Sequence, residues 1–249
     1  MSFFQSAKDG DNFSYCVVQR ACVGPNESYQ FYMGGVAMAT HVDALERHFD
    51  KPLLWVTTQF LSHGMLDNEL TLEVKQIGGG KNVVQAEAIM RRDDEVLHRS
   101  IAALGARGDE PDRAFVRMPE VKSPEDCPVK QGDANASADN LIGQFDRRTA
   151  FEDSDSGTEY MWIRPLEGMK TDAAYLTLVS DFFLGAHVRT RGGTSLDNTF
   201  RLINAHQTEW ILTVTQISSF TRGAAHGNIY MFAEDGTLLA TSSQTGMLP

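Results

Sequence analysis

The sequence has few cysteines, no long apolar run and a shortage of basic residues, and each of these features excludes a class of protein. Its three cysteines are an odd number without CxxC spacing, which indicates neither a disulfide framework nor a zinc site. No apolar run approaches the roughly 20 residues that span a membrane. The formal net charge of −11 argues against nucleic-acid binding, which depends on neutralising phosphates with a basic face.

Several short catalytic motifs are also missing. No Gly-x-Ser-x-Gly elbow occurs, so a serine nucleophile has little support. Gly78-Gly79-Gly80-Lys81 lacks the spacing of a phosphate loop and reads as a hairpin. His41 and His48 share a helical face, but no third ligand stands at metal spacing, so we expect neither metal nor cofactor. The N-terminus lacks the basic start and apolar core of a signal peptide, and we expect a cytoplasmic location.

An internal repeat divides the chain of 249 residues into two domains. With an offset of 140, Glu69–Ile77 falls on Glu209–Ile217 with five of nine positions identical. The period is far longer than a solenoid unit of about 20 to 50 residues, so each copy is a whole domain. We expect domains at residues 1–107 and 140–249. Residues 108–139 are rich in Gly, Pro, Asp and Ala and form the predicted linker, in which Phe115 and Val116 are candidates for docking on a neighbour.

Both halves show one helix beside several antiparallel strands. Apolar residues at helical spacing predict a helix within Met33–Phe49, and a strongly apolar run predicts another at Ala174–Leu184, with a cap at Thr171 or Asp172. Alternating polarity marks strands with one face on a core. Those strands are Phe13–Val23, Leu53–Phe60, Glu69–Ile77, Val83–Met90, Val96–Leu104, Tyr160–Arg164, Leu196–Ile203, Trp210–Ser219, His226–Ala233 and Leu238–Ser243. The fold class is α+β, and edge-to-edge pairing of the halves would give one continuous sheet around two helices.

Three polar residues distinguish the second copy from the first. Asp197, Ser218 and Gln244 lie opposite Thr57, Gly78 and Ala103. Strand alternation turns Ser218 and Gln244 toward apolar faces, whereas Asp197 requires a bulge or a place before the regular strand. If the three converge, the carboxylate can act as general base on a water molecule that the hydroxyl and the amide orient. The alternative is that Ser and Gln are common at strand ends and that these differences between the two copies arose by drift.

Two glycines at the start of the first helix are a second candidate element. Backbone amides at a helix N-terminus can stabilise an oxyanion, and Gly34-Gly35 leaves such amides unobstructed by side chains. The alternative is that these glycines only let the helix pack close to the sheet.

The order of several short motifs resembles the acyl-CoA thioesterase II family of double hotdog proteins. The motifs are Met33-Gly34-Gly35, Ser195-Leu196-Asp197, Glu209-Trp210-Ile211-Leu212, Arg222-Gly223, Asp235-Gly236 and Gln244-Thr245-Gly246. The resemblance implies two tandem hotdog domains and hydrolysis of acyl-CoA without a covalent intermediate. In that family an aspartate, a threonine or serine, and a glutamine hold the water, and we match them to Asp197, Ser218 and Gln244. The family's aromatic-His-Arg-Pro segment is absent, since Phe200-Arg201-Leu202-Ile203 stands in its place.

Other assignments remain open at this point. Arg189, Arg191, Arg201 and Arg222 could attract the phosphates of coenzyme A or could be ordinary surface residues. Asp43 and His48 have the Asp-x4-His spacing of hotdog hydratases, although both fall inside the predicted helix. The protein could also bind acyl-CoA without catalysis. A homodimer is expected, because such pairs of domains usually bury further surface.

Overall fold

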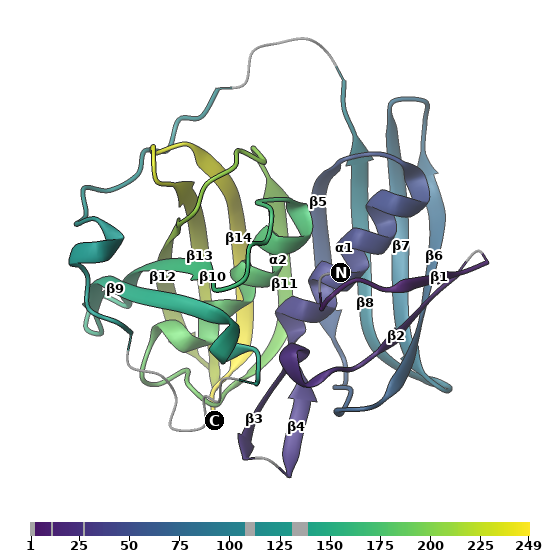
Figure 1. Ribbon diagram of the computed structural model, residues 1–249, viewed down its shortest axis with the longest axis horizontal. Coiled ribbons are helices and arrows are strands. Elements are labelled where there is room, and N and C mark those ends of the chain that lie inside the picture. The colour runs from purple at the N-terminus through teal and green to yellow at the C-terminus, as the bar shows by residue number, and fades with distance from the viewer. Residues whose placement is uncertain (1–2, 11, 27, 108–112, 131–138) are drawn as a thin grey trace.

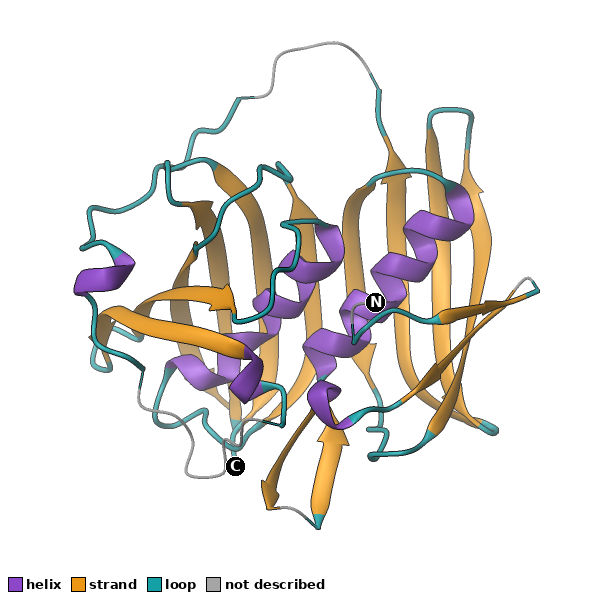
Figure 2. Ribbon diagram, viewed as in Figure 1, coloured by secondary structure: helices purple, strands orange, loops and turns teal. Residues whose placement is uncertain are grey.

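The computed structural model describes residues 3–10, 12–26, 28–107, 113–130 and 139–249. Within them one twelve-stranded antiparallel sheet curves behind two helices that lie side by side (Figure 1, Figure 2). The strand order is β1-β2-β6-β7-β8-β5-β11-β14-β13-β12-β10-β9, so each half of the chain supplies one half of the sheet. This is the double hotdog architecture that the resemblance implied, with the two like halves that the repeat predicted.

The first half contributes the N-terminal part of the sheet, a small second sheet and the longer helix. Its elements are β1 (Ala7–Asp9), β2 (Asn12–Cys16), a 3-10 turn (Gln19–Ala21), β3 (Cys22–Asn26), β4 (Tyr29–Tyr32), α1 (Gly34–Phe49), β5 (Leu53–Phe60), β6 (Glu69–Gly79), β7 (Val83–Arg92) and β8 (Glu95–Gly105). The predicted strand over Phe13–Val23 is therefore wrong in its second half. The chain leaves the large sheet after Cys16, and Cys22 pairs instead with Tyr32 in the β3–β4 hairpin.

The second half repeats this plan with a shorter helix. Its elements are η3 (Ile142–Gln144), β9 (Phe145–Asp153), β10 (Thr158–Pro165), α2 (Ala173–Ser180), η4 (Asp181–Ala186), β11 (Thr194–Leu202), β12 (Ile211–Thr221), β13 (Ala224–Ala233) and β14 (Leu238–Met247). The predicted helix cap is confirmed, because the Asp172 carboxylate accepts the backbone N–H of Tyr175 at 2.8 Å. The α-helix ends earlier than predicted and continues as the 3-10 helix η4.

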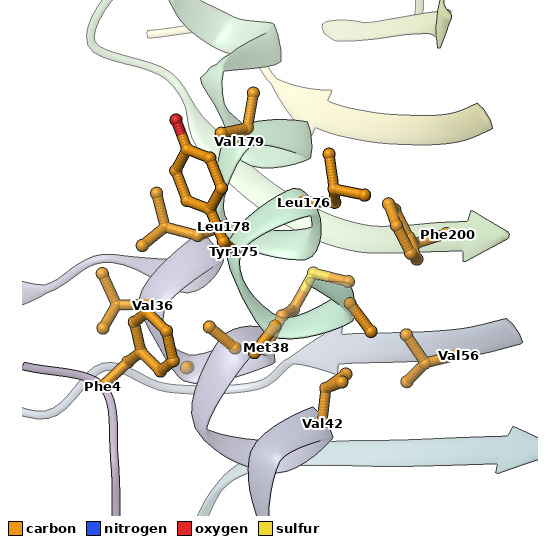
Figure 3. Packing of buried hydrophobic residues seen from close by; sticks show 14 of the residues in the cluster. Phe4, Val36, Met38, Val42, Val56, Tyr175, Leu176, Leu178, Val179 and Phe200 are labelled. Atoms are coloured by element: carbon orange, nitrogen blue, oxygen red, sulfur yellow. The ribbon is translucent and has the colours of Figure 1, made fainter. Parts of the chain in front are cut away.

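The two halves join through β5 and β11. These strands pair antiparallel, with Thr57 opposite Thr199, and the two hydroxyls lie 3.0 Å apart. The predicted continuous sheet is therefore confirmed. In front of this junction α1 packs against α2, with Val36 and Met38 of α1 beside Tyr175 and Leu178 of α2 (Figure 3).

Alternation explains why the sheet holds the helices on one face. In β6 Leu70, Leu72 and Val74 are buried, whereas the residues between them are exposed. Every residue of α2 is buried, which accounts for its nearly uniform apolar composition. No helix in the described part of the chain is long and apolar enough to cross a membrane.

Residues 113–130 lie against the outer face of the C-terminal half of the sheet. The indole N–H of Trp162 donates to the carbonyl of Lys122 at 3.0 Å, and Lys130 forms a buried ion pair with Glu159. Met118 and Val121 pack on an apolar cluster there, whereas Phe115 is 82 % exposed and Val116 40 %. The side chains that dock on the sheet are therefore Met118 and Val121, and not the predicted candidates Phe115 and Val116. Residues 108–112 and 131–138 of the predicted linker lie outside the described residues, and the domain limits remain a prediction.

Candidate active site

Asp181 is a buried carboxylate at the junction between α2 and η4. The residue is only 6 % exposed, and it lies against the start of α1 and beside the ends of β11 and β14. Its Oδ1 accepts the Gln244 amide N–H at 2.6 Å and lies 3.3 Å from the Ser195 hydroxyl, which donates to it. The Gln244 Nε2 also donates to Ser195 Oγ at 2.8 Å. An acid, an alcohol and an amide therefore form one connected group.

A bulge in β11 brings Ser195 into this group. Ser195 lies opposite Gly246 and Asp197 lies opposite Thr245, so Leu196 is the extra residue between them. Without the bulge Ser195 would share a face with Asp197 and would point away from Gln244. With it, Ser195 points to the inner face of the sheet, where Gln244 is buried.

The N-terminus of α1 completes the group from the first half of the chain. Met33, the N-cap residue, provides no side-chain hydrogen bond, and the backbone N–H of Gly35 donates to the Asp181 carboxylate. The approach is close. A Cβ at Gly34 would lie 2.9 Å from Asp181 Oδ2, and a Cβ at Gly35 would lie 2.6 Å from the Leu178 carbonyl oxygen. Only glycine fits at this contact between the two helices.

Burial dominates the electrostatics of Asp181. Removal from water raises the pKa of its carboxyl group to about 6, and the donors Gln244, Gly35 and Ser195 lower it only in part. At pH 7 the group is therefore mostly ionised, yet it is a far better proton acceptor than an exposed aspartate. A carboxylate with a pKa near the working pH is suited to act as a general base.

The predicted site residues divide into two sets. Gln244 is buried as predicted, and Gly34 and Gly35 lie against Asp181. Asp197 does not join them, since its carboxylate accepts the backbone N–H of Thr245 at 2.9 Å on the other side of the bulge. Ser218 is exposed at a bulge in β12, and its hydroxyl lies 3.5 Å from the Asn228 amide.

The sequence held one signal for Asp181 that the repeat comparison missed. Asp181 is the only charged residue in the apolar run Ala173–Ala186, and a lone carboxylate in a buried helix needs partners. Regular alternation turns both Ser195 and Asp197 away from the core, and Asp197 needed a bulge to face inward. The bulge is present at Leu196, but it turns Ser195 and not Asp197 toward Gln244. With the offset of 140, Asp181 falls on His41 of α1, whose Nδ1 lies 2.6 Å from the Ser100 hydroxyl.

Comparison with known proteins decides the family. The model of the acyl-CoA thioesterase C-terminal domain matches residues 124–248, half of the chain. The chain belongs to the acyl-CoA thioesterase family. It is thus a thioester hydrolase. None of the curated proteins matches the chain in sequence.

Solved structures share the fold of this acyl-CoA thioesterase over nearly its whole length. A candidate thioesterase from Novosphingobium aromaticivorans DSM 12444 is 29 % identical with a TM-score of 0.90, covering 98 % of this chain and 97 % of that one. A protein with the hot dog fold from Alicyclobacillus acidocaldarius is 20 % identical with a TM-score of 0.85, covering 99 % and 96 %. An acyl-CoA thioesterase II from Mycobacterium marinum is 18 % identical with a TM-score of 0.79, covering 99 % and 96 %.

Three of the four candidate arginines lie toward one end of this thioesterase's C-terminal half. Arg189 stacks on Phe220, with its guanidinium carbon 4.4 Å from the ring centre, and Arg222 is in the turn that follows the same strand. Arg191 is 3.4 Å from Glu152 and donates to the carbonyl of Gly185 in η4. Arg201 is separate, because it projects from the middle of the sheet opposite Trp55 and Thr241.

The hydratase assignment finds no support in the arrangement of Asp43 and His48. Both lie in α1, as predicted, and a separation of five residues places them on different sides of a helix. Asp43 forms an ion pair with Arg47 at 2.9 Å, and the His48 ring packs 4.7 Å from the Phe49 ring. Within the described residues, no cluster of three or more His, Cys, Asp or Glu side chains could hold a metal ion.

The pKa of Asp181 predicts a pH dependence for an enzyme that uses this carboxylate as its base. A general base must be deprotonated, and the pKa of Asp181 is about 6. We expect kcat/KM for an acyl-CoA to fall about tenfold per pH unit as the pH is lowered below that value. Thiol release in samples quenched at fixed times would measure the profile, with circular dichroism at each pH as the control for folding. A rate that is constant between about pH 5 and pH 8 would contradict the assignment of the base.

Proposed function

We propose that the enzyme hydrolyses acyl-CoA to a free acid and coenzyme A, with Asp181 as the general base. The observation that carries this proposal is the buried Asp181 carboxylate, which Gln244, Ser195 and the Gly35 backbone N–H contact together. It replaces the predicted combination of Asp197, Ser218 and Gln244, of which only Gln244 belongs to the buried group.

The geometry supports direct attack by water. A water molecule at the carboxylate loses a proton to Asp181 while its oxygen forms a bond to the thioester carbon. The tetrahedral intermediate then breaks its carbon–sulfur bond, and the proton on Asp181 passes to the leaving thiolate. General-base catalysis of this kind contributes roughly 10²- to 10⁴-fold.

Ser195 fits the role of orienting this water better than that of nucleophile. Its hydroxyl oxygen accepts from Gln244, and its proton is directed to Asp181 Oδ1. Its partners are an amide and a carboxylate, whereas nucleophilic serines are activated by an adjacent strong base such as histidine. We therefore propose hydrolysis without an acyl-enzyme.

The start of α1 is suited to stabilise the oxyanion. The first-turn N–H groups of a helix have no intrahelical acceptors, and the helix dipole favours negative charge at this end. Gly34 is partly exposed, as are Ser195 and Phe60, whereas Asp181 and Gln244 are buried. A thioester can thus approach from the side of Gly34 and Ser195, with the charge of its carbonyl oxygen near the helix end.

Coenzyme A carries several phosphates, for which the enzyme offers exposed arginines. Arg189, Arg191 and Arg222 lie in segments that follow η4 or border β14, toward the same end as Ser195. We propose that these three, and not Arg201, attract the nucleotide part of the substrate. The cytoplasmic location expected from the sequence and a role in lipid metabolism remain proposals.

The decisive experiment is the release of coenzyme A thiol from a panel of short, medium, long and aromatic acyl-CoAs. Turnover by the folded protein establishes the activity, and the preferred acyl group supplies the substrate class. Ligand-dependent thermal stabilisation without thiol release would instead indicate a non-catalytic binder. Consumption of an enoyl-CoA without thiol release would indicate a hydratase.

The expected homodimer is tested separately from the activity. Sedimentation of the purified protein at working concentration would give the mass of the particle. A monomer alone would reject the homodimer and would leave the site unchanged, because every contact that we describe at Asp181 comes from one chain.

A further inference from the structure

The side-chain amide of Gln244 can act at Asp181 in only one of its two orientations. In the observed one, Nε2 donates to Asp181 Oδ1 and to Ser195 Oγ. Turned by half a rotation, the amide would place its carbonyl oxygen against the carboxylate, where two acceptors repel each other. The two orientations occupy the same volume, so packing alone does not choose between them.

A chain of buried hydrogen bonds makes this choice. Ser180 donates its hydroxyl proton to the carbonyl oxygen of Thr177 at 2.7 Å, and a carbonyl can only accept. The Ser180 oxygen must therefore accept from its other neighbour, the Asn198 amide, whose Nδ2 lies 3.1 Å away. The direction of the chain thus begins at a fixed backbone group of α2.

The same Nδ2 then determines the orientation of Gln244. Asn198 Nδ2 carries two protons, and the second goes to Gln244 Oε1 at 3.1 Å. The Ser242 hydroxyl occupies the remaining acceptor of Asn198, donating to Oδ1 at 2.7 Å. With Oε1 held by Asn198, the Nε2 of Gln244 must face Asp181.

Burial prevents water from replacing any of these partners. Asn198 and Ser180 have no exposed surface, and Gln244 and Ser242 are 3 % and 4 % exposed. A reversed amide would leave a buried donor or acceptor without its partner, at a cost of about 1–3 kcal/mol for each group. The cross-strand register supports the same pairing, since Asn198 in β11 lies directly opposite Gln244 in β14.

We propose that Asn198 is a positioning residue for hydrolysis, which acts by fixing the orientation of the Gln244 amide. The proposal rests on the function proposed above, because it concerns the same carboxylate. Asn198 has no contact with Asp181 among its hydrogen bonds and reaches it only through Gln244.

Loss of the Asn198 amide has a consequence that a purely structural role does not have. When Gln244 is free to turn, its carbonyl oxygen replaces its N–H beside Asp181 for part of the time. The Gln244 donor is the largest favourable contribution to the ionised form of Asp181, so its loss moves the pKa of that carboxyl group further upward. The acid limb of the rate profile should move with it.

The test compares Asn198→Leu and Asn198→Ala with the matched control Ser242→Ala. Leucine keeps nearly the same volume without hydrogen bonds, and alanine serves if leucine does not fold. We expect kcat to fall by about ten- to a hundredfold, the size expected for loss of a hydrogen bond to a charged group, with KM nearly unchanged. The acid limb of kcat/KM should move up by about one pH unit. Ser242→Ala leaves both bonds of Asn198 Nδ2 in place and should retain the wild-type limb.

A double-mutant cycle tests whether Asn198 acts through Gln244. In a Gln244→Leu background, Asn198→Leu should have no further effect on kcat or on the acid limb. Equal reductions in both backgrounds, or a folded Asn198 variant with the wild-type limb, would overturn the proposal. Either of these outcomes would leave the proposed function intact, provided that Asp181→Asn abolishes the activity. Activity that survives Asp181→Asn would instead overturn Asp181 as the base in the proposed function.

Discussion

Asp181→Asn is expected to reduce acyl-CoA hydrolysis by roughly 10²- to 10⁴-fold, the contribution of a general base. Asparagine has the size of aspartate and can still accept the Gln244 N–H through its amide oxygen, so the packing between α1 and α2 persists. It cannot take a proton from water. Thiol release at saturating substrate measures the loss as a fall in kcat, and thermal unfolding reports whether the protein is folded.

Asp197→Asn is the matched control for this experiment. The Asp197 carboxylate accepts one backbone N–H, from Thr245, and an asparagine oxygen can do the same. We expect the variant to retain activity within about threefold of the wild type, since it loses no contact to the buried group. The reverse result, with activity lost in Asp197→Asn and kept in Asp181→Asn, would restore the assignment made from the sequence.

The burial of Asp181 is also expected to lower the free energy of unfolding at neutral pH. Its pKa is raised in the folded protein, so the folded state binds more protons than the unfolded state between about pH 4 and pH 6. The free energy of unfolding therefore contains a contribution from Asp181 that is present at low pH and is lost as the pH rises through about 6. Its size is on the order of 3 kcal/mol.

Gly35→Ala is expected to impair both stability and activity. Alanine has the higher helix propensity, by about 1 kcal/mol, so at an open position the change would stabilise α1. Here the new Cβ would lie 2.6 Å from the Leu178 carbonyl oxygen and 2.8 Å from Asp181 Cβ. The backbone of α2 must move away. We expect a loss of about 1–3 kcal/mol in the free energy of unfolding and about 10²-fold in activity, since Asp181 moves with α2.

Gly168→Ala provides the control for the loss of a glycine. A Cβ at Gly168 would have no heavy atom within 4 Å, and its backbone does not have a positive φ. We expect unchanged activity and unchanged or slightly raised stability. Denaturant unfolding and thiol release on both variants would measure the difference. Wild-type activity in Gly35→Ala would show that the start of α1 does not have to touch Asp181.

The internal repeat and the strand alternation predicted most of the architecture. Offset copies of β6 and β12, a helix after Gly34-Gly35 and the Asp172 cap are local patterns with a fixed period or a fixed spacing. Strand β9 was missed because Phe145–Asp153 carries five charged residues and lies at an edge of the sheet. Segments of this kind have little hydrophobic periodicity.

The residues that the structure groups around Asp181 were predicted only in part, and each difference has a local cause. Gln244 follows the regular alternation of β14, so its burial could be predicted. Ser195 could not, because the bulge at Leu196 reverses the face of every residue before it in β11. Asp181 had no counterpart in the repeat comparison, and its charge alone did not say which elements would surround it.

The sequence by itself determined the two halves, their shared order of helix and strands, and the apolar faces that pair them. These features depend on periodicities of 2 and 3.6 residues and on short-range capping, which are properties of neighbouring positions. The tertiary structure decided the candidate active site. The N–H of Gly35 and the carboxylate of Asp181 meet only because β5 pairs with β11 and brings α1 against α2. Contact between groups 146 positions apart depends on how the halves pack, for which no local pattern gives a signal.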